Sequence, residues 1–226
     1  MELPIFNDNL KSSASWNQLL AAAQTQWEPT RAATLPSIRE TQVAQLLARA
    51  GLANEAAPRF QQAAELVSGW AATPEFQFDL ARLLELHRIL AGVAPDAEVL
   101  RQTEPLPINM LHDPVPALLL PRMLDNAFDW FSTDGFKEMH GVEQAAVVFL
   151  RLLDLHPFPQ LSESTALLAA SFYTERAGLP PLFVFTDEVT LQRYANVTET
   201  AFRMLTQPLV EFFAEMLRRA MLLTSE

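Results

Sequence analysis

Apolar residues recur at helical rather than strand spacing along most of this chain. Between residues 80 and 90, leucines three and four positions apart give a wide apolar stripe on one face of a helix. The segment 141–155 is apolar on nearly all sides, which is typical of a buried central helix. We find neither paired runs of alternating apolar and polar residues nor a strand–helix–strand rhythm. The pattern predicts an all-α protein of roughly nine helices with almost no strand.

Capping and breaking residues predict where several helices begin and end. Ser37 with Glu40 three residues later has the form of a capping box, and Gly51 is a typical helix stop. Thr73 followed by proline predicts the start of another helix, which Gly92 would end. Further elements are predicted as helices over 15–27, 54–70 and 116–131, a loop over 132–136, a helix capped by Thr186, and a final helix opened by Thr198.

Prolines interrupt the helical pattern over one long stretch, EPLPINMLHDPVPALLLPR, which runs from residue 104 to residue 122. The four prolines between positions 105 and 116 forbid a continuous helix there. The part PLPINM could pair as one arm of a short hairpin. A plain extended connector is the alternative, and the sequence leaves both open.

The composition allows one core of ordinary size. Of the 226 residues, 50% are apolar, which is enough for one sizeable core or for one core with a small appendage. We expect a helical extension over residues 1–54 that packs on a helical domain over residues 55–226. The absence of cysteine excludes disulfides, thiol catalysis and zinc–thiolate sites.

The charge and hydropathy of the chain make two classes of binding partner, nucleic acids and membranes, unexpected. There are 16 Lys and Arg against 27 Asp and Glu, a formal net charge of −11, and the basic residues form no patch. Binding to nucleic acid or to an anionic membrane is therefore not expected. The first residues lack a basic segment followed by an apolar one, and no apolar run approaches the roughly 18 residues of a membrane span. We expect a cytoplasmic protein.

The stretch with the most chemical content is DLHPFPQLSESTALLAASFYTERAGLPP, from residue 154 to residue 181. His156 follows one apolar helix, and a second begins about six residues later with Ser162 or Ser164 as its expected N-cap. The unpaired N–H groups at such a helix start form a generic anion site. A histidine beside it could accept a proton from a hydroxyl. A purely structural histidine in a helix–helix loop is the alternative.

This stretch resembles the central motif of the Fic (filamentation-induced-by-cAMP) family. HPFPQLSESTAL is similar to HPFxxGNGRxxR, and the later ERAGLPP matches the family's raGlpp segment. With the segments upstream, the resemblance covers roughly residues 57–181. It implies an all-α Fic core with a short β-hairpin flap, and an activity that transfers AMP or another phosphate-containing group to a protein hydroxyl.

The resemblance assigns a family role to eight positions of the loop and the helix after it. By position, the base is His156, the core anchor is Phe158, the magnesium ligand falls at Gln160, the two glycines at Leu161 and Glu163, the asparagine at Ser162, and the two arginines at Ser164 and Leu167.

These substitutions predict a weak nucleotide site. Leucine and glutamate obstruct the approach of backbone N–H groups to phosphate, an amide supplies no charge to a divalent cation, and no Lys or Arg stands between Arg151 and Arg176. We therefore predict a Fic-fold protein without transferase activity that acts through protein binding. The alternatives are an active transferase with His156 as base and a domain that keeps only the fold. ATP and magnesium are implied only if the family's activity is retained.

Two further family elements can be located. The flap would comprise Leu106, Pro107, Ile108 and Asn109, whose extended edge could bind a protein partner, and a homodimer is a second expected mode of association. Glu40 lies where some members carry an inhibitory glutamate, although a capping role fits its surroundings better.

The other histidines do not predict a metal site. His87, His112 and His140 do not have the spacing of metal ligands. His87, which lies in the predicted helix that ends at Gly92, is predicted to be a packing residue.

Overall fold

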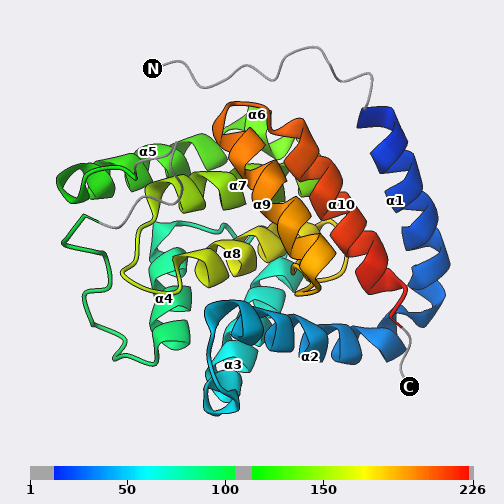
Figure 1. The fold of residues 1–226 in the computed structure, drawn as a ribbon, viewed down its shortest axis with the longest axis horizontal. Helices are drawn as coiled ribbons and strands as arrows, with labels where there is room; N and C mark the ends of the chain where they lie inside the picture. Colours follow the sequence, from blue (N-terminus) through cyan, green and yellow to red (C-terminus); the bar gives the residue numbers. More distant parts are fainter. Residues whose placement is uncertain (1–12, 105–113, 224–226) are drawn as a thin grey trace.

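A hairpin of two central helices, α7 and α8, forms the middle of the fold (Figure 1). The computed structural model describes residues 13–104 and 114–223. Within those ranges every regular element is helical, which confirms the predicted all-α class, while the predicted hairpin flap (Leu106–Asn109) lies outside them. The α-helices are α1 (Ser13–Trp27), α2 (Arg31–Ala50), α3 (Ala57–Ala72), α4 (Leu80–Ala91), α5 (Leu120–Phe131), α6 (Asp134–Lys137), α7 (Gly141–Leu155), α8 (Ser162–Arg176), α9 (Glu188–Phe202) and α10 (Gln207–Met221).

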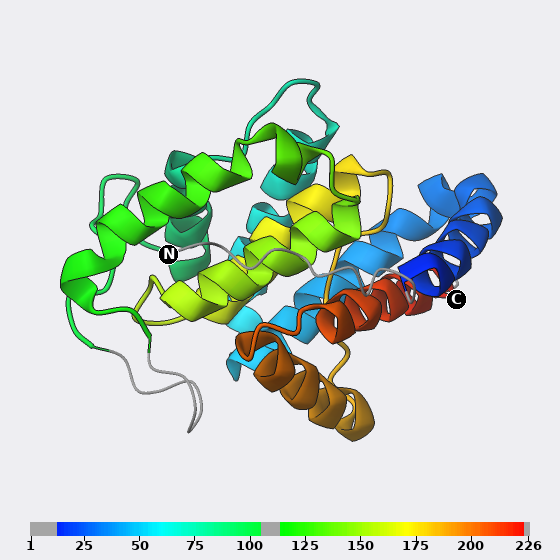
Figure 2. The same ribbon diagram turned by 90° about the horizontal axis from the view of Figure 1, so that it is seen from above.

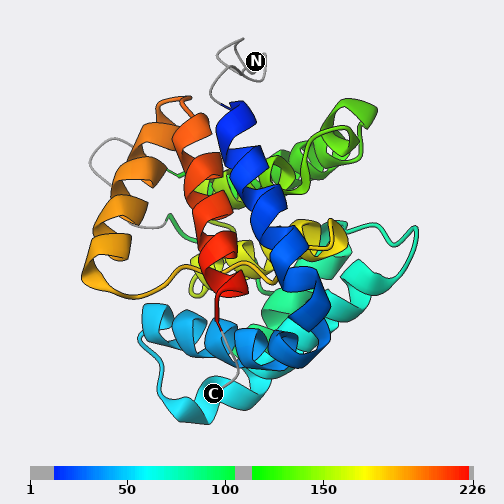
Figure 3. The ribbon, with the colours of Figure 1, turned by 90° about the vertical axis from the view of Figure 1, so that its right-hand side faces the viewer.

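Helices from both halves of the chain surround this hairpin. α3 and α4 pack on α8, while α5 and α10 pack on α7. Seen from above, α5 lies alongside α7 and runs antiparallel to it (Figure 2). α1 lies alongside α10, so the first and last helices of the chain form one side of the molecule (Figure 3). The predicted boundary near residue 54 stays a prediction. No helix in the described ranges has the length and apolar character needed to cross a membrane.

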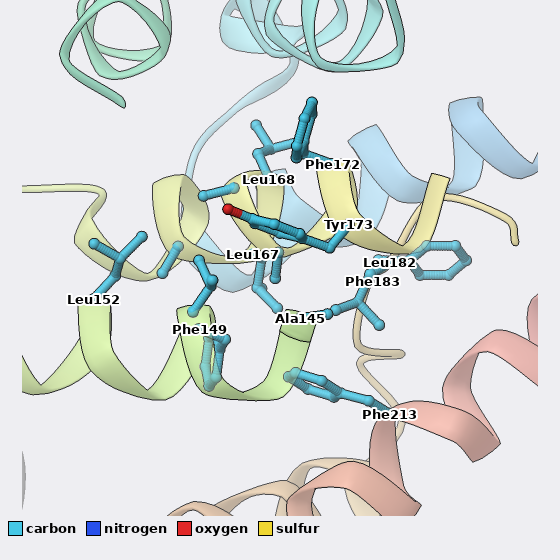
Figure 4. Close-up of a cluster of buried hydrophobic side chains, with 14 of the residues drawn as sticks. Ala145, Phe149, Leu152, Leu167, Leu168, Phe172, Tyr173, Leu182, Phe183 and Phe213 are labelled. Atoms are coloured by element: carbon cyan, nitrogen blue, oxygen red, sulfur yellow. The ribbon is translucent and has the colours of Figure 1, made fainter. Parts of the chain in front are cut away.

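The core is built mainly from aromatic and leucine side chains on both sides of α8. Phe149 of α7 meets Phe213 of α10 edge to face, with ring centroids 5.3 Å apart (Figure 4). On the other side Phe172 and Tyr173 of α8 form a similar pair at 5.0 Å. Nearly all of α8 is buried, and this explains why its sequence carries so little polar periodicity.

The start of α7 is fixed both by local capping hydrogen bonds and by close packing against the end of α8. The His140 side chain accepts a hydrogen bond from the Val142 N–H (3.2 Å), and the Glu143 carboxylate accepts one from the His140 N–H (2.9 Å). A Cβ at Gly141 would lie 2.5 Å from the Cβ of Ala177, so only glycine permits the observed approach of α7 to the end of α8. The predicted bounds of α7, residues 141–155, are confirmed.

Several predicted helix starts are wrong, because tertiary contacts outweigh local caps. α2 begins at Arg31 rather than Ser37, although Pro36 lies inside it; Trp27 donates from its indole nitrogen to Thr34 Oγ1 (2.8 Å) and holds the first turn against the core. Glu40 consequently lies in mid-helix and is exposed, so it caps nothing. The stop at Gly51 is confirmed.

The start of α4 is also later than predicted. Thr73 ends α3, and α4 begins at Leu80 with Asp79 as its N-cap, whose carboxylate accepts from the Arg82 N–H (2.9 Å). The residues between run without helix because Phe76 stacks on Trp70, with ring centroids 5.4 Å apart. The predicted end of α4 at Gly92 is confirmed.

Three further boundaries near the end of the chain and around α6 differ from the prediction. Asp187 rather than Thr186 caps α9, and Thr198 lies inside α9 instead of opening the last helix. The chain turns between α9 and α10 through Met204, whose φ of 70° is left-handed. The predicted loop over 132–136 contains the start of the short helix α6, capped by Thr133.

A largely buried carboxyl group lies where α2, α3 and α8 meet. Glu175 accepts hydrogen bonds from Ser171 Oγ (3.0 Å), from Ser68 Oγ and from Arg39 Nη2 (3.3 Å). Burial raises the pKa of Glu175 above the ordinary value of 4.5, and these three partners counteract only part of that effect. The buried site therefore favours the protonated acid relative to the unfolded chain.

This carboxyl predicts a specific dependence of stability on pH. Because its pKa is higher in the folded state, its stabilising contribution is complete below the unfolded pKa and is lost as the pH rises through the folded pKa. We expect the free energy of unfolding of the wild type, minus that of Glu175→Gln, to fall as the pH rises from about 4.5 toward neutral. Urea titrations across that range measure the difference. Glu40→Gln, at an exposed position, should show no such slope, and a difference for Glu175 that rises with pH would contradict the assignment.

Candidate active site

The loop between α7 and α8 begins and ends in left-handed backbone conformations. α7 ends at His156, with φ 44° and ψ 60°, and its N–H donates to the Leu152 carbonyl (3.0 Å). Leu161 precedes α8 with φ 57° and ψ 17°. Such conformations cost about 1–3 kcal/mol for residues other than glycine, so the surrounding contacts must hold the loop. Ser162 and Ser164 lie inside α8, and the expected cap by either serine is wrong.

Ser162 and Phe158 close the loop on itself. Ser162 Oγ accepts from the Phe158 N–H (3.0 Å) and donates to the Phe158 carbonyl (2.9 Å). The Phe158 ring is fully buried and stacks on the His87 imidazole of α4, with ring centroids 3.6 Å apart and planes 2° apart. These contacts attach the loop to the core.

His87 continues this attachment on the other side of its ring. Thr165 Oγ1 donates to the Leu161 carbonyl (2.9 Å), so it is free to accept from His87 Nδ1, which lies 3.0 Å away. Burial, aided by nearby Arg88, lowers the pKa of His87 to about 4, and the ring is neutral at pH 7. The sequence marked His87 as a packing residue and did not indicate its place behind the loop.

The His156 imidazole is half-buried at the end of α7. Its Nδ1 is buried and has no hydrogen-bond partner among residues 13–104 and 114–223. Burial lowers its pKa, Arg101 lowers it further, and Glu163 opposes both. The imidazole is therefore neutral at pH 7 and retains the ability to accept a proton.

A buried arginine, which sequence analysis did not identify, holds the backbone around His156. Arg101 Nε donates to the His156 carbonyl (2.7 Å), and its two terminal nitrogens donate to the carbonyls of Leu155 (3.2 Å), Thr103 (3.2 Å) and Val115. The whole residue is only 3% exposed. Its guanidinium lies beside the candidate site, but these carbonyls already occupy its donors. No sequence motif indicated it, because its partners lie in distant segments.

The first turn of α8 carries a paired carboxylate. Glu163 accepts hydrogen bonds from Arg49 at the end of α2 and from the Tyr194 hydroxyl of α9. The Arg49 guanidinium carbon also lies 4.3 Å from the centroid of the Tyr194 ring. A carboxylate at this position is stabilised by the positive end of the helix dipole. Burial, with Glu163 adding to it, raises the pKa of Tyr194 well above its usual range, so the tyrosine remains a donor.

The remaining predicted site residues divide between surface and core. Gln160 is exposed, whereas Ser164 and Leu167 face the interior. His140 lies at the opposite end of α7 from His156, and His112 lies outside the described residues. No group of three or more His, Cys, Asp or Glu side chains within the described ranges could hold a metal ion.

Solved structures share this helical arrangement. A fragment of Fic-1 (residues 134–508) from Caenorhabditis elegans superimposes with a TM-score of 0.72 and 18% identity, over 93% of this chain and 72% of that one. A Fic domain containing signaling protein from Bacteroides thetaiotaomicron gives 0.67 and 15%, over 92% of both chains. The fold is that of Fic domains.

Comparison of the sequence with known proteins gives a match to a family as well as to a fold. Residues 77–174 match the family model described as Fic/DOC family. This chain is 27% identical over 116 residues to Protein adenylyltransferase fic-1 of Caenorhabditis briggsae, which is 51% of this chain and 22% of the relative. It is 28% identical over 115 residues to Protein adenylyltransferase Fic of Nematostella vectensis, 50% and 27% of the two chains. Residues 77–174 of this chain are thus similar to the Fic/DOC family, and the part matched in the sequence comparison spans about a quarter of these relatives.

Proposed function

We propose that this chain is a Fic-fold protein without AMP-transferase activity and that it acts by binding protein. The observation that carries the proposal is the Glu163 carboxylate in the first turn of α8, paired with Arg49 and Tyr194. A phosphate at this helix start would meet a negative charge already bound there. The two arginines near the loop cannot compensate, because Arg49 is paired with Glu163 and Arg101 is occupied by backbone carbonyls.

The expected energetic contributions to phosphoryl transfer favour a complete loss of catalysis over slow catalysis. The free N–H groups of a helix start contribute about 0.3–1 kcal/mol to holding an anion at an exposed end. An arginine fork and a bound divalent cation each contribute several kcal/mol to a transferring phosphoryl group. A positioned base such as His156 adds only about 10²–10⁴-fold in rate. The base alone therefore does not restore the reaction.

The residues present do not fit the magnesium ion that the family's activity would require. The position expected to supply an acidic ligand holds Gln160, and no carboxylate cluster lies near it within the described ranges. Asp154, the nearest acidic residue before the loop, is paired with Arg151 (2.6 Å). We therefore assign no reaction step to a metal ion.

Protein binding is supported by exposed apolar side chains next to the predicted flap. Leu118 is 91% exposed and Leu119 is 40% exposed, and both follow shortly after the segment 106–109. Adjacent exposed leucines are typical of a surface that is covered in a complex. Sedimentation at rising protein concentration separates a homodimer from a different partner, because only self-association depends on this chain alone.

Thermal unfolding with ATP and magnesium tests the inactive nucleotide site. We expect no shift in Tm for the wild type at millimolar ATP. A variant that restores four positions of the family motif, Gln160→Asp with Leu161→Gly, Glu163→Gly and Ser164→Arg, should gain a shift of several degrees, because a ligand at about 100 times its Kd contributes about 2.7 kcal/mol. Arg49→Gln is the matched control, since it frees Glu163 without removing the carboxylate.

An active transferase with His156 as base is the second candidate. It is supported by the lowered pKa of His156, which keeps the imidazole neutral, and by the relatives named protein adenylyltransferases. Labelled ATP offered with candidate protein substrates decides between the two. Transfer of label that disappears in His156→Ala would refute the binding-only proposal.

A further inference from the structure

A second concave region lies at the opposite end of the α7–α8 hairpin from His156. It is a pocket of about 410 Å³, bounded by the start of α7, the end of α8, the end of α5 with α6, and the extended segment before α4. Gly141, the first residue of α7, lines it, whereas His156 follows the last residue of the same helix. Fifteen helical residues separate the two regions by about 20 Å, so this pocket does not belong to the candidate active site.

Seven of the sixteen residues that line the pocket are aromatic. Phe78 lies among three other rings of the wall, with centroid distances of 5.3 Å to Phe172, 6.2 Å to Phe128 and 6.5 Å to Tyr173. Phe136 of α6 closes the far side at 5.4 Å from Tyr173. The two contacts with Tyr173 are edge to face and the other two are tilted. Aromatic surroundings of this kind favour a flat apolar group, and the volume lies within the usual range for small-molecule sites.

The mouth of this pocket is cationic, in contrast to the rest of the chain. Lys137 and Arg176 both line it, against one carboxylate, Asp79, which is bound to the first turn of α4. The whole chain has a net charge of −11 and contains only one other lysine, Lys11. An excess of positive charge at a concave apolar site therefore selects for an anionic group on the ligand.

Lys137 is the cation that remains available to such a ligand. Arg176 donates to the backbone carbonyls of Phe76, Trp70 (3.5 Å) and Thr73 (3.0 Å), so it contributes charge but few free donors. Lys137 is exposed, and its ammonium makes no ion pair or hydrogen bond with any residue in 13–104 or 114–223.

We propose that this pocket binds a small aromatic anion, with its ring among the phenylalanines and its acidic group at Lys137. This site is separate from the one on which the proposed function rests. An aryl carboxylate or aryl sulfonate has the required shape and charge. The proposal does not depend on whether the chain transfers AMP, and its failure would leave the proposed function untouched.

Fluorescence titration with 1-anilinonaphthalene-8-sulfonate tests the proposal directly. We expect saturable binding of one probe per chain, displaced by 1-naphthoate. Lys137→Gln should weaken binding of this probe about three- to fivefold, because an exposed charge pair is lost. The neutral analogue N-phenyl-1-naphthylamine, which lacks the sulfonate, should bind wild type and Lys137→Gln equally well.

Two variants separate this pocket from other surfaces. Ser132 lies at the mouth and is exposed, so Ser132→Trp should fill the pocket and weaken both probes at least about tenfold while the Tm stays near that of the wild type. Arg122→Gln removes an exposed cation of α5 outside the pocket and should change neither affinity. Binding that does not saturate, or that Arg122→Gln weakens as much as Lys137→Gln, would overturn the proposal. If Ser132→Trp fails to fold, the comparison of the two probes on Lys137→Gln decides.

Discussion

Replacing Arg101 with alanine is expected to lower the free energy of unfolding by about 3–5 kcal/mol. Arg101 is 3% exposed and its guanidinium donates to four backbone carbonyls. Two of them, of Thr103 and Val115, lie on either side of residues 105–113, and the other two, of Leu155 and His156, lie at the end of α7. Removing it leaves buried acceptors unpaired, and each costs about 1–3 kcal/mol.

The same change has a second consequence that a merely destabilised protein would not show. Arg101 lowers the pKa of His156, so its removal should raise that pKa. Urea denaturation measures the stability, and the pH dependence of the His156 ring signals in proton NMR measures the pKa. Arg101→Lys should retain part of the stability because the charge remains, although a lysine has no planar fork.

Arg122→Ala is the matched control for Arg101. Arg122 is exposed on α5, and its loss should cost no more than about 0.5 kcal/mol. If Arg101→Ala costs less than about 1 kcal/mol, or if the pKa of His156 does not rise, then Arg101 does not hold the loop in the way described.

Replacing Phe158 with alanine is the second large effect that we expect, again about 3–5 kcal/mol of unfolding free energy. The ring is fully buried and stacks face to face on His87. Its removal leaves a cavity between α4 and α8 and exposes to that cavity a neutral histidine, which the stack had covered. Thermal or urea unfolding of the variant measures the cost.

Phe158→Leu provides the graded comparison. It keeps most of the apolar volume and loses only the ring stack, so it should cost less than about half as much as the alanine variant. Equal losses for the two variants would show that the stack with His87, rather than the filled volume, holds the loop. A loss below about 1.5 kcal/mol for Phe158→Ala would show that Phe158 does not anchor it.

Some elements could be predicted because their local and tertiary requirements coincide. α7 was predicted with its observed bounds, since a segment that is apolar on all sides has no other stable environment than the core. The stops at Gly51 and Gly92 were predicted because both residues take left-handed φ values that other residues adopt only at a cost. The Fic resemblance rested mainly on the pieces LHPFP and ERAGLPP, each of which is a short run of neighbouring residues.

The predicted helix starts were wrong where contacts of aromatic side chains contribute more stabilisation than a local cap. The Thr73–Pro74 pair is a plausible helix start, yet the stacking of Phe76 on Trp70 keeps this segment without helix until Asp79. Ser37 and Glu40 have the spacing of a capping box, but the bond from Trp27 to Thr34 extends α2 upstream past them. Each local signal offers about 1 kcal/mol, which a buried aromatic contact can exceed.

By itself, the sequence determined the helical class, the central buried helix, the resemblance to the Fic family and the position of the histidine beside a helix start. Those features depend on periodicity and on residues close together in the chain. Only the tertiary structure decided the electrostatics of the site: Arg101 reaches His156 across 55 positions, and Arg49 reaches Glu163 across 114. Pairing between such distant residues leaves no spacing in the sequence, because it depends on how the helices pack against one another.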